Sequence, residues 1–259
     1  MKEAGEKIVA LTAYEVLFAR LLEEVGVDLI LVGDSLGQVV LGYDSTLPVT
    51  LDEMIHHARA VRRGAPRTFT VLDLPFLSFQ VSEEEAVRNA GRALKEAGVH
   101  AVKLEGGDGR TCATIERLVA AGIPVMGHVG LTPQSVHALG GYRVQGRGED
   151  AAERIQGEAR DLESAGCFGV VLELIPSSLA GEISEALTIP TIGIGAGPRC
   201  DGQVLVLHDA LGLNPGFEPR FLKRFARLWD RAREGVEAYA REVREGDYPA
   251  QEHSFESEA

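Results

Sequence analysis

The sequence contains little cysteine, and its cysteines form no recognisable pair. Cys112, Cys167 and Cys200 are odd in number and show no CxxC spacing, so they indicate neither a disulfide framework nor a zinc site. No apolar run approaches the roughly 20 residues that a membrane-spanning helix needs. Residues 1–15 carry charges through their first apolar stretch, unlike a secretory signal. We therefore expect a cytoplasmic protein with no membrane partner.

Positive charge is also scarce. The chain has 26 Lys and Arg residues against 39 Asp and Glu residues, which gives a net charge of −13. A protein that binds nucleic acid without sequence preference needs a basic surface, so this class is excluded. Two interpretations of the acidic balance remain: plain solubility, or a cation held by clustered carboxylates.

Short apolar runs rich in β-branched residues recur along the 259 residues, separated by turns and amphipathic segments. Their near-continuous apolar character is typical of strands that are covered on both faces. Strand–helix alternation with short loops predicts a parallel sheet, and this number of strands favours a closed (β/α)8 TIM barrel, of the α/β class. The predicted strands are Ile8–Leu11, Leu29–Val32, Phe69–Leu72, Ala101–Leu104, Pro124–Met126, Val170–Leu172, Thr191–Ile194 and Val204–Leu207.

The segments between these strands have helical spacing. No linker or shift in composition interrupts the chain, so we expect residues 1–259 to form a single barrel domain. A helical segment over Phe217–Glu245 and a polar tail should follow the last strand, which places the C-terminal region at about 217–259. The predicted helices of the barrel are Ala13–Val25, Ser82–Ala97, Thr111–Ala121, Asp150–Ala165 and Leu179–Ala186.

Acidic residues stand at the ends of three successive strands. Asp34, Asp73 and Glu105 should meet at the mouth of the barrel, where the carboxyl ends of all strands converge. Like charges that are brought together resist ionisation unless a cation balances them. Mg²⁺ prefers hard oxygen ligands and keeps sites open for substrate oxygens. These three residues are therefore the metal candidates, although any one of them alone could be a helix cap.

Three further polar residues fall at or near strand ends. Lys103 lies within an apolar run, where it either pairs with a carboxylate or binds a substrate carboxylate. Glu173 has apolar neighbours, which should raise its pKa. A raised pKa suits a general base that takes a proton from carbon. The alternative is a buried Glu that is paired with another group and has no catalytic role. His128 could donate a hydrogen bond to a developing oxyanion or could be structural.

The glycine-rich segment 140–148 follows the fifth strand at the expected mouth. We predict a mobile lid in which Arg143 or Arg147 helps to bind an anion, with a plain surface loop as the alternative.

Several longer motifs together resemble the ketopantoate hydroxymethyltransferase family. They occur in the family's order over nearly the whole chain, so chance does not explain the match. The motifs are LVGDSLG (31–37), DSTLPVT (44–50), VRRGAP (61–66), DLPF (73–76), VKLEGG (102–107), GHVGLTPQS (127–135), GGYRVQGRG (140–148), IGIGAG (192–197), DGQVLVLHD (201–209) and YPAQEHSF (248–255).

The resemblance implies a (β/α)8 barrel of the phosphoenolpyruvate/pyruvate type and a homo-oligomer, often a homodecamer. It implies transfer of a hydroxymethyl group from 5,10-methylenetetrahydrofolate to 3-methyl-2-oxobutanoate, through a Mg²⁺-stabilised enolate, to give 2-dehydropantoate for pantothenate and coenzyme A synthesis. By the same resemblance, Asp34, Asp73 and Glu105 hold the metal, and Glu173 is the proton acceptor. Ser35, Asp73, Lys103 and His128 would contact the substrate.

Two other functions compete with this one. A lyase or mutase of the same barrel type would also use a metal-bound enolate, but commonly needs a cysteine at the mouth, and none of the three follows a predicted strand end. A metal-dependent binding protein for oxo acids or folates would have no need of Glu173 beside an apolar wall.

Overall fold

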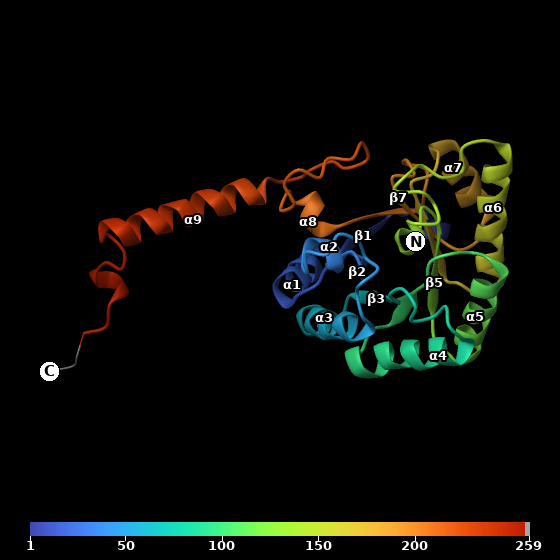
Figure 1. Cartoon of the computed structure of the whole chain (residues 1–259), viewed down its shortest axis with the longest axis horizontal. Coiled ribbons are helices and arrows are strands. Elements are labelled where there is room, and N and C mark those ends of the chain that lie inside the picture. Colours follow the sequence, from blue (N-terminus) through green and yellow to red (C-terminus); the bar gives the residue numbers. More distant parts are fainter. Residues whose placement is uncertain (257–259) are drawn as a thin grey trace. The chain divides into compact units, whose positions relative to one another are not determined.

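The structure is a computed structural model that describes residues 1–256. Eight parallel strands pair in chain order, and the first also pairs with the last, so the sheet closes into the predicted barrel (Figure 1). The strands are β1 (Ile8–Thr12), β2 (Leu29–Val32), β3 (Phe69–Asp73), β4 (Ala101–Lys103), β5 (Val125–Gly130), β6 (Gly169–Glu173), β7 (Thr191–Ile194) and β8 (Gly202–Leu205).

Helices connect the strands and surround the barrel (Figure 1). Their ends follow the local sequence signals: Ser82 accepts a hydrogen bond from the Glu85 N–H at the start of α4, and Gly26 ends α1 in the left-handed conformation. The helices are α1 (Val16–Val25), α2 (Leu36–Val39), α3 (Leu51–Gly64), α4 (Glu83–Arg92), α5 (Gly109–Ala120), α6 (Glu149–Ser164) and α7 (Ser177–Ala186), with short helical turns η1 (Lys2–Ala4), η2 (Ala93–Ala97) and η3 (Pro133–Ser135). A short helix, α8 (Leu207–Ala210), follows the last strand.

The structure differs from the predicted strands and helices at several places, which include helix α3 and strands β5 and β8. Helix α3 was not predicted, although Thr50 and Glu53 form a capping box at its start. Strand β5 continues to Gly130, so His128 lies within the strand and not after it. Strand β8 begins two residues earlier than predicted, at Gly202, and the chain at Leu207 is already helical.

The interior of the barrel is filled by one layer of apolar side chains to which every strand contributes. Only side chains that point inward can meet in this way, because successive residues of a strand face opposite sides of the sheet. The layer therefore fixes which residues of each strand face the barrel axis. Its buried members are Ala10, Leu29, Leu31, Val71, Ala101, Met126, Val171, Ile192 and Val204.

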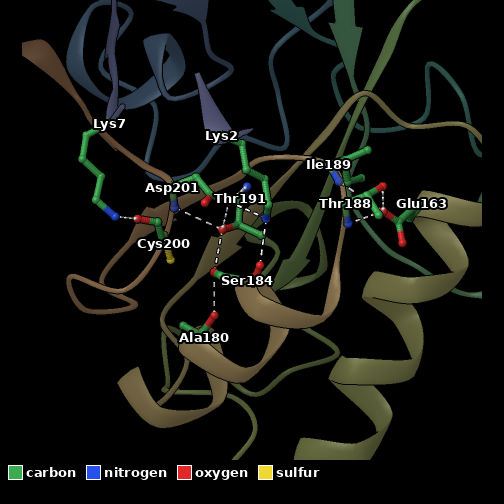
Figure 2. Close-up of polar contacts among 10 residues, drawn as sticks. All are labelled: Lys2, Lys7, Glu163, Ala180, Ser184, Thr188, Ile189, Thr191, Cys200 and Asp201. Atoms are coloured by element: carbon green, nitrogen blue, oxygen red, sulfur yellow. Dashed lines mark hydrogen bonds and ion pairs between the residues drawn. The ribbon is translucent and has the colours of Figure 1, made fainter. Parts of the chain in front are cut away.

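A polar network ties the chain together at the amino-terminal end of β7 and β8 (Figure 2). One carboxylate oxygen of Asp201 accepts hydrogen bonds from the Thr191 N–H at 2.8 Å, the Thr191 hydroxyl at 3.0 Å and the Lys2 ammonium at 2.8 Å. Lys2 also donates to the carbonyl oxygen of Ser184 in α7, at 2.7 Å. The network joins η1, α7 and the last two strands at the end opposite the mouth.

The chain divides into two compact units, Met1–Leu207 and His208–Ala259. The second unit contains α9 (Leu228–Glu245) and a helical turn η4 (Gln251–His253). The prediction of a helix from Phe217 was wrong for residues 217–227, which contain Pro219 and hold their backbone through bonds such as Phe225 N–H to Ala210 O at 2.7 Å. None of the helices within residues 1–256 has the length and apolar character needed to cross a membrane.

Candidate active site

The predicted site residues project from the mouth of the barrel, just beyond the apolar layer. Asp73, Lys103, His128 and Glu173 each lie two residues after a member of that layer. Side chains two apart on a strand share a face, so all four point inward. The corresponding position on β2 is Gly33. A Cβ atom there would lie 3.3 Å from Asp73 Oδ2 and 2.9 Å from Ser35 Oγ, so the missing side chain leaves room for both.

Lys103 forms the centre of this group. Its Nζ lies 2.7 Å from Asp73 Oδ1, 4.0 Å from Glu105 Oε1 and 3.2 Å from His128 Nδ1, and its side chain is 4% exposed. Burial alone would lower the pKa of Lys103, but the charges of Asp73, Glu105 and Asp34 raise it. Lys103 is therefore a fixed cation at neutral pH, and a covalent role that requires the free amine is disfavoured.

His128 is neutral in this setting. Burial, and then the charge of Lys103, hold its pKa well below the ordinary range. An ammonium group can only donate, so Nδ1 accepts from Lys103 and the proton resides on Nε2. That nitrogen lies 3.2 Å from Glu173 Oε2. The Nε2–H group thus lies beside the predicted base, but the two form no hydrogen bond.

Asp34 and Ser35 follow β2 and join the same group. The Asp34 N–H donates to Asp73 Oδ2 at 3.2 Å, and Asp34 Oδ2 accepts from Gln134 Nε2 at 2.9 Å. Ser35 Oγ shares a hydrogen bond of 2.8 Å with the hydroxyl of Tyr14. The structure thus brings together all seven residues that the sequence singled out: Asp34, Ser35, Asp73, Lys103, Glu105, His128 and Glu173.

The site holds four carboxyl groups but only one cationic side chain, Lys103, and three of the carboxyls resist ionisation. Burial, and then the neighbouring Asp73 carboxylate, raise the pKa of Asp34 to about 7. Burial also raises the pKa of Glu105 well above its ordinary value. Lys103 contacts two of the four carboxyl groups, those of Asp73 and Glu105, and is the one Lys or Arg among residues 1–256 that forms an ion pair with any of the four. A cation that binds oxygen ligands would relieve this imbalance, so the donor set suits a divalent ion such as Mg²⁺.

The side chains are not already arranged as a closed metal cage. Within residues 1–256, no three Asp, Glu, His or Cys side chains form a cluster with the geometry of a metal site. Asp73 contacts Lys103 through Oδ1, and Asp34 contacts Gln134 through Oδ2.

Glu173 ends β6 and is held through its backbone. Burial raises its pKa to about 7, although Lys103 acts in the opposite direction, and its side chain is 17% exposed. The Glu173 carbonyl oxygen accepts from the Leu131 N–H at 2.9 Å. Gly130, with φ of 98°, lies so close that a Cβ atom there would be 2.2 Å from this oxygen. The next residue, Leu174, has the unusual φ of 45° for a leucine.

The predicted lid, residues 140–148, is attached to the same strand end. Its Gln145 N–H donates to the Leu174 carbonyl oxygen at 2.8 Å, and Tyr142 forms a hydrogen bond with the Gln38 side chain. Arg143 and Arg147 are exposed. Their role in binding an anion stays a prediction.

The cysteines lie elsewhere. Cys167 precedes β6 and Cys200 precedes β8, both at the amino-terminal ends of strands, and Cys112 lies in α5. Burial raises the pKa of all three thiols. A thiol acid or nucleophile at the mouth, which the competing lyase or mutase would commonly need, is therefore not provided by these residues.

Sequence reasoning missed Gln134. This residue of η3 is 5% exposed and contacts Asp34 by its side chain and Glu105 by its main chain. The sequence offers one weak signal: a polar residue in the turn Leu131–Gln134, directly after a strand.

The barrel has solved structural relatives that define its class. It matches 2,3-dimethylmalate lyase, a member of the PEP mutase/isocitrate lyase superfamily, with a TM-score of 0.61 and 17% identity, over 98% of this chain and 90% of that one. It matches phosphonopyruvate hydrolase in complex with oxalate and Mg²⁺ with a TM-score of 0.61 and 14% identity, over 97% and 89%. The fold is thus a (β/α)8 barrel, as predicted, and it is similar to the fold of these solved structures.

Sequence comparison identifies the family within this class. Residues 1–251 match the model of ketopantoate hydroxymethyltransferase, so the chain belongs to that family. Proteins named 3-methyl-2-oxobutanoate hydroxymethyltransferase are similar over nearly the whole chain. That of Syntrophus aciditrophicus is 58% identical over 98% of this chain and 93% of its own, and that of Moorella thermoacetica is 57% identical over 98% and 94%. The resemblance found in the sequence is confirmed.

Proposed function

We propose that this enzyme transfers a hydroxymethyl group from 5,10-methylenetetrahydrofolate to 3-methyl-2-oxobutanoate and produces 2-dehydropantoate, a step of pantothenate and coenzyme A biosynthesis. The observation that carries the proposal is the buried arrangement of Lys103, three carboxylates and Glu173 at one barrel mouth. The names of the relatives supply the substrate.

Asp34, Asp73 and Glu105 are the residues that would hold one Mg²⁺. These residues end or follow three successive strands, and a divalent ion would offset the burial and the repulsion that raise the pKa values of Asp34 and Glu105. When bound, Mg²⁺ would withdraw electron density from the 2-oxo group and so make the neighbouring C3–H bond more acidic.

The chain's own residues would position the substrate and move the proton. Lys103 is a fixed cation and would attract the substrate carboxylate, while Ser35 and Asp73 border the same space. Glu173 would accept the C3 proton, since its pKa of about 7 makes it a base that is present in useful amounts at neutral pH. The His128 Nε2–H group lies 3.2 Å from Glu173 Oε2 and is without a hydrogen-bond partner among residues 1–256, so it would be available to donate to a substrate oxygen.

The overall reaction consumes one water molecule. The proton leaves C3 for Glu173, and the electron pair of the broken C–H bond forms a new bond from C3 to the methylene carbon. The two bonds from that carbon to the folate nitrogens break, and the hydroxide of one water molecule bonds to the carbon. One nitrogen takes up the remaining proton of the water and the other takes up the proton from Glu173, so tetrahydrofolate leaves and Glu173 is regenerated.

The family resemblance also leads us to place the enzyme in the cytoplasm as a homo-oligomer, with a homodecamer as the expected form. Helix α9 has no buried residue within its own unit, and Trp229, Val236 and Tyr239 are exposed there, which supports self-association.

The test of the proposed chemistry is proton exchange at C3. We expect 3-methyl-2-oxobutanoate in D₂O to lose its C3–H signal in proton NMR when enzyme and Mg²⁺ are present, because Glu173 removes that proton before carbon transfer. A full assay with 5,10-methylenetetrahydrofolate should then form 2-dehydropantoate. Absence of product in the full assay would refute the function, whereas product without exchange would show that folate must bind first.

The exchange rate should depend on pH in one direction. Burial raises the pKa of Glu173 to about 7, so Glu173 is protonated and inactive as a base at lower pH. We expect the rate to rise about tenfold per pH unit below pH 7 and to level off above it, measured at saturating Mg²⁺ between roughly pH 5.5 and 9. A rate that falls as the pH rises through 7 would contradict Glu173 as the base.

A further inference from the structure

Gln134 occupies a central place among the carboxylates at the barrel mouth. Its Nε2 donates to Asp34 Oδ2 at 2.9 Å and to the Leu74 carbonyl oxygen at 3.0 Å. Its main-chain N–H donates to Glu105 Oε2 at 2.9 Å. One residue of η3 thus contacts carboxylates that follow two different strands, β2 and β4.

The neighbours of the Gln134 amide determine its orientation. A main-chain carbonyl oxygen can only accept, so the NH₂ group must face Leu74 O, and its second hydrogen then points to Asp34. The amide oxygen faces the other way and accepts from Gln80 Nε2 at 3.2 Å. Each end of this buried amide has the partner that it requires, and Gln80 reinforces the orientation from an exposed position.

We infer that Gln134 is a positioning residue for the metal site. Its side-chain amide holds Asp34, and its main-chain N–H holds Glu105, in the orientation in which the two carboxylates share one cation. Gln80 fixes the orientation of the Gln134 amide. The inference rests on the proposed function, because it assumes that these carboxylates bind a divalent ion. Groups that orient metal ligands typically change metal affinity by about 10- to 100-fold when they are lost.

The direct test is Mn²⁺ binding to the protein without substrate, followed by the EPR signal of free Mn²⁺. Gln134→Met keeps the side-chain length and the main-chain N–H to Glu105, but removes the donors to Asp34. We expect its Mn²⁺ affinity to fall about tenfold or more. Affinity within twofold of the wild type would overturn the inference. A wild-type protein that binds no Mn²⁺ would instead refute the metal site of the proposed function, and this inference with it.

A second variant tests the role of Gln80 at an exposed position, where folding is not at risk. The carboxylate introduced by Gln80→Glu could only accept hydrogen bonds, so the Gln134 amide oxygen would lose its donor and be repelled, which would loosen the hold of the amide on Asp34. We expect Mn²⁺ affinity to fall about threefold to tenfold. Electrostatics alone would make the added negative charge strengthen binding, so unchanged or tighter binding would overturn the role of Gln80.

Two further measurements separate positioning from general damage. Gln156→Glu is the matched control, since Gln156 of α6 also donates one hydrogen bond, to Glu182, and gains the same charge. It should bind Mn²⁺ as the wild type does. In turnover, Gln80→Glu should need more Mn²⁺ for half-maximal activity but keep kcat at saturating Mn²⁺. A lower kcat at every Mn²⁺ concentration would indicate a structural role and overturn the inference.

Discussion

Replacement of Glu173 by Gln is expected to abolish turnover while substrate binding is retained. The amide has nearly the same shape as the carboxylate but cannot accept the C3 proton. Loss of a general base typically costs about 10²- to 10⁴-fold in rate, so we expect kcat to fall by about 10³-fold. Both product formation and C3 exchange should show the loss, whereas binding of 3-methyl-2-oxobutanoate, measured by calorimetry, should change little.

The control for this variant is Glu153→Gln, the same change at an exposed position of α6. It should leave kcat as in the wild type. If Glu173→Gln kept more than about one-tenth of the wild-type kcat, the proton acceptor would have to be another residue. A parallel loss of binding would show that Glu173 contacts the substrate in its ground state.

Replacement of Lys103 by Met should affect both folding stability and activity. Lys103 is the cation that balances the buried carboxylates, and removing one partner of a buried ion pair typically costs about 3–5 kcal/mol. Neighbouring charges raise the pKa of Lys103, so its contribution is fully present below the ordinary lysine pKa and therefore at neutral pH. We expect a loss of free energy of unfolding within this range, measured by urea denaturation without metal.

The loss should be larger at alkaline than at mildly acidic pH. The raised pKa values of Asp34 and Glu105 allow these carboxyls to take up protons at lower pH, which reduces the uncompensated charge. Lys95→Met, at an exposed position of η2, is the control and should change stability by less than about 0.5 kcal/mol. Equal effects of the two variants would show that Lys103 does not balance the site.

The barrel was predictable from the sequence because its strands are buried on both faces. Such strands appear as short apolar runs, and each polar residue that interrupts or ends one becomes conspicuous, as Lys103 and Glu173 do. Because side chains two residues apart on a strand face the same side of the sheet, the inward direction of Lys103 and Glu173 could also be predicted. Elements that depend on tertiary contact were harder to predict. Strand β5 extends past Met126 because His128 and Gly130 pair with Val171 and Glu173 of β6.

Gln134 shows why the remaining part of the site could not be read from the sequence. It stands on a short turn, and nothing in its local sequence indicates burial or contact with Asp34, which is 100 residues away in the chain. Its importance arises from the closure of the barrel, which brings the segments after β2, β3 and β5 together. Secondary-structure propensity and hydrophobic periodicity depend on residues that are neighbours in the sequence, so they cannot predict contacts between distant segments.

Because Gly130 has no side chain, the position of Glu173, the proposed base, depends on both β5 and β6. Glu173 reaches its position because the neighbouring strand has no side chain where its carbonyl oxygen must lie, and because Leu131 holds that oxygen. A β6 segment transplanted alone into another barrel would therefore not carry its catalytic geometry with it. The smallest transferable module for protein engineering is the β5–β6 pair with the turn that follows β5.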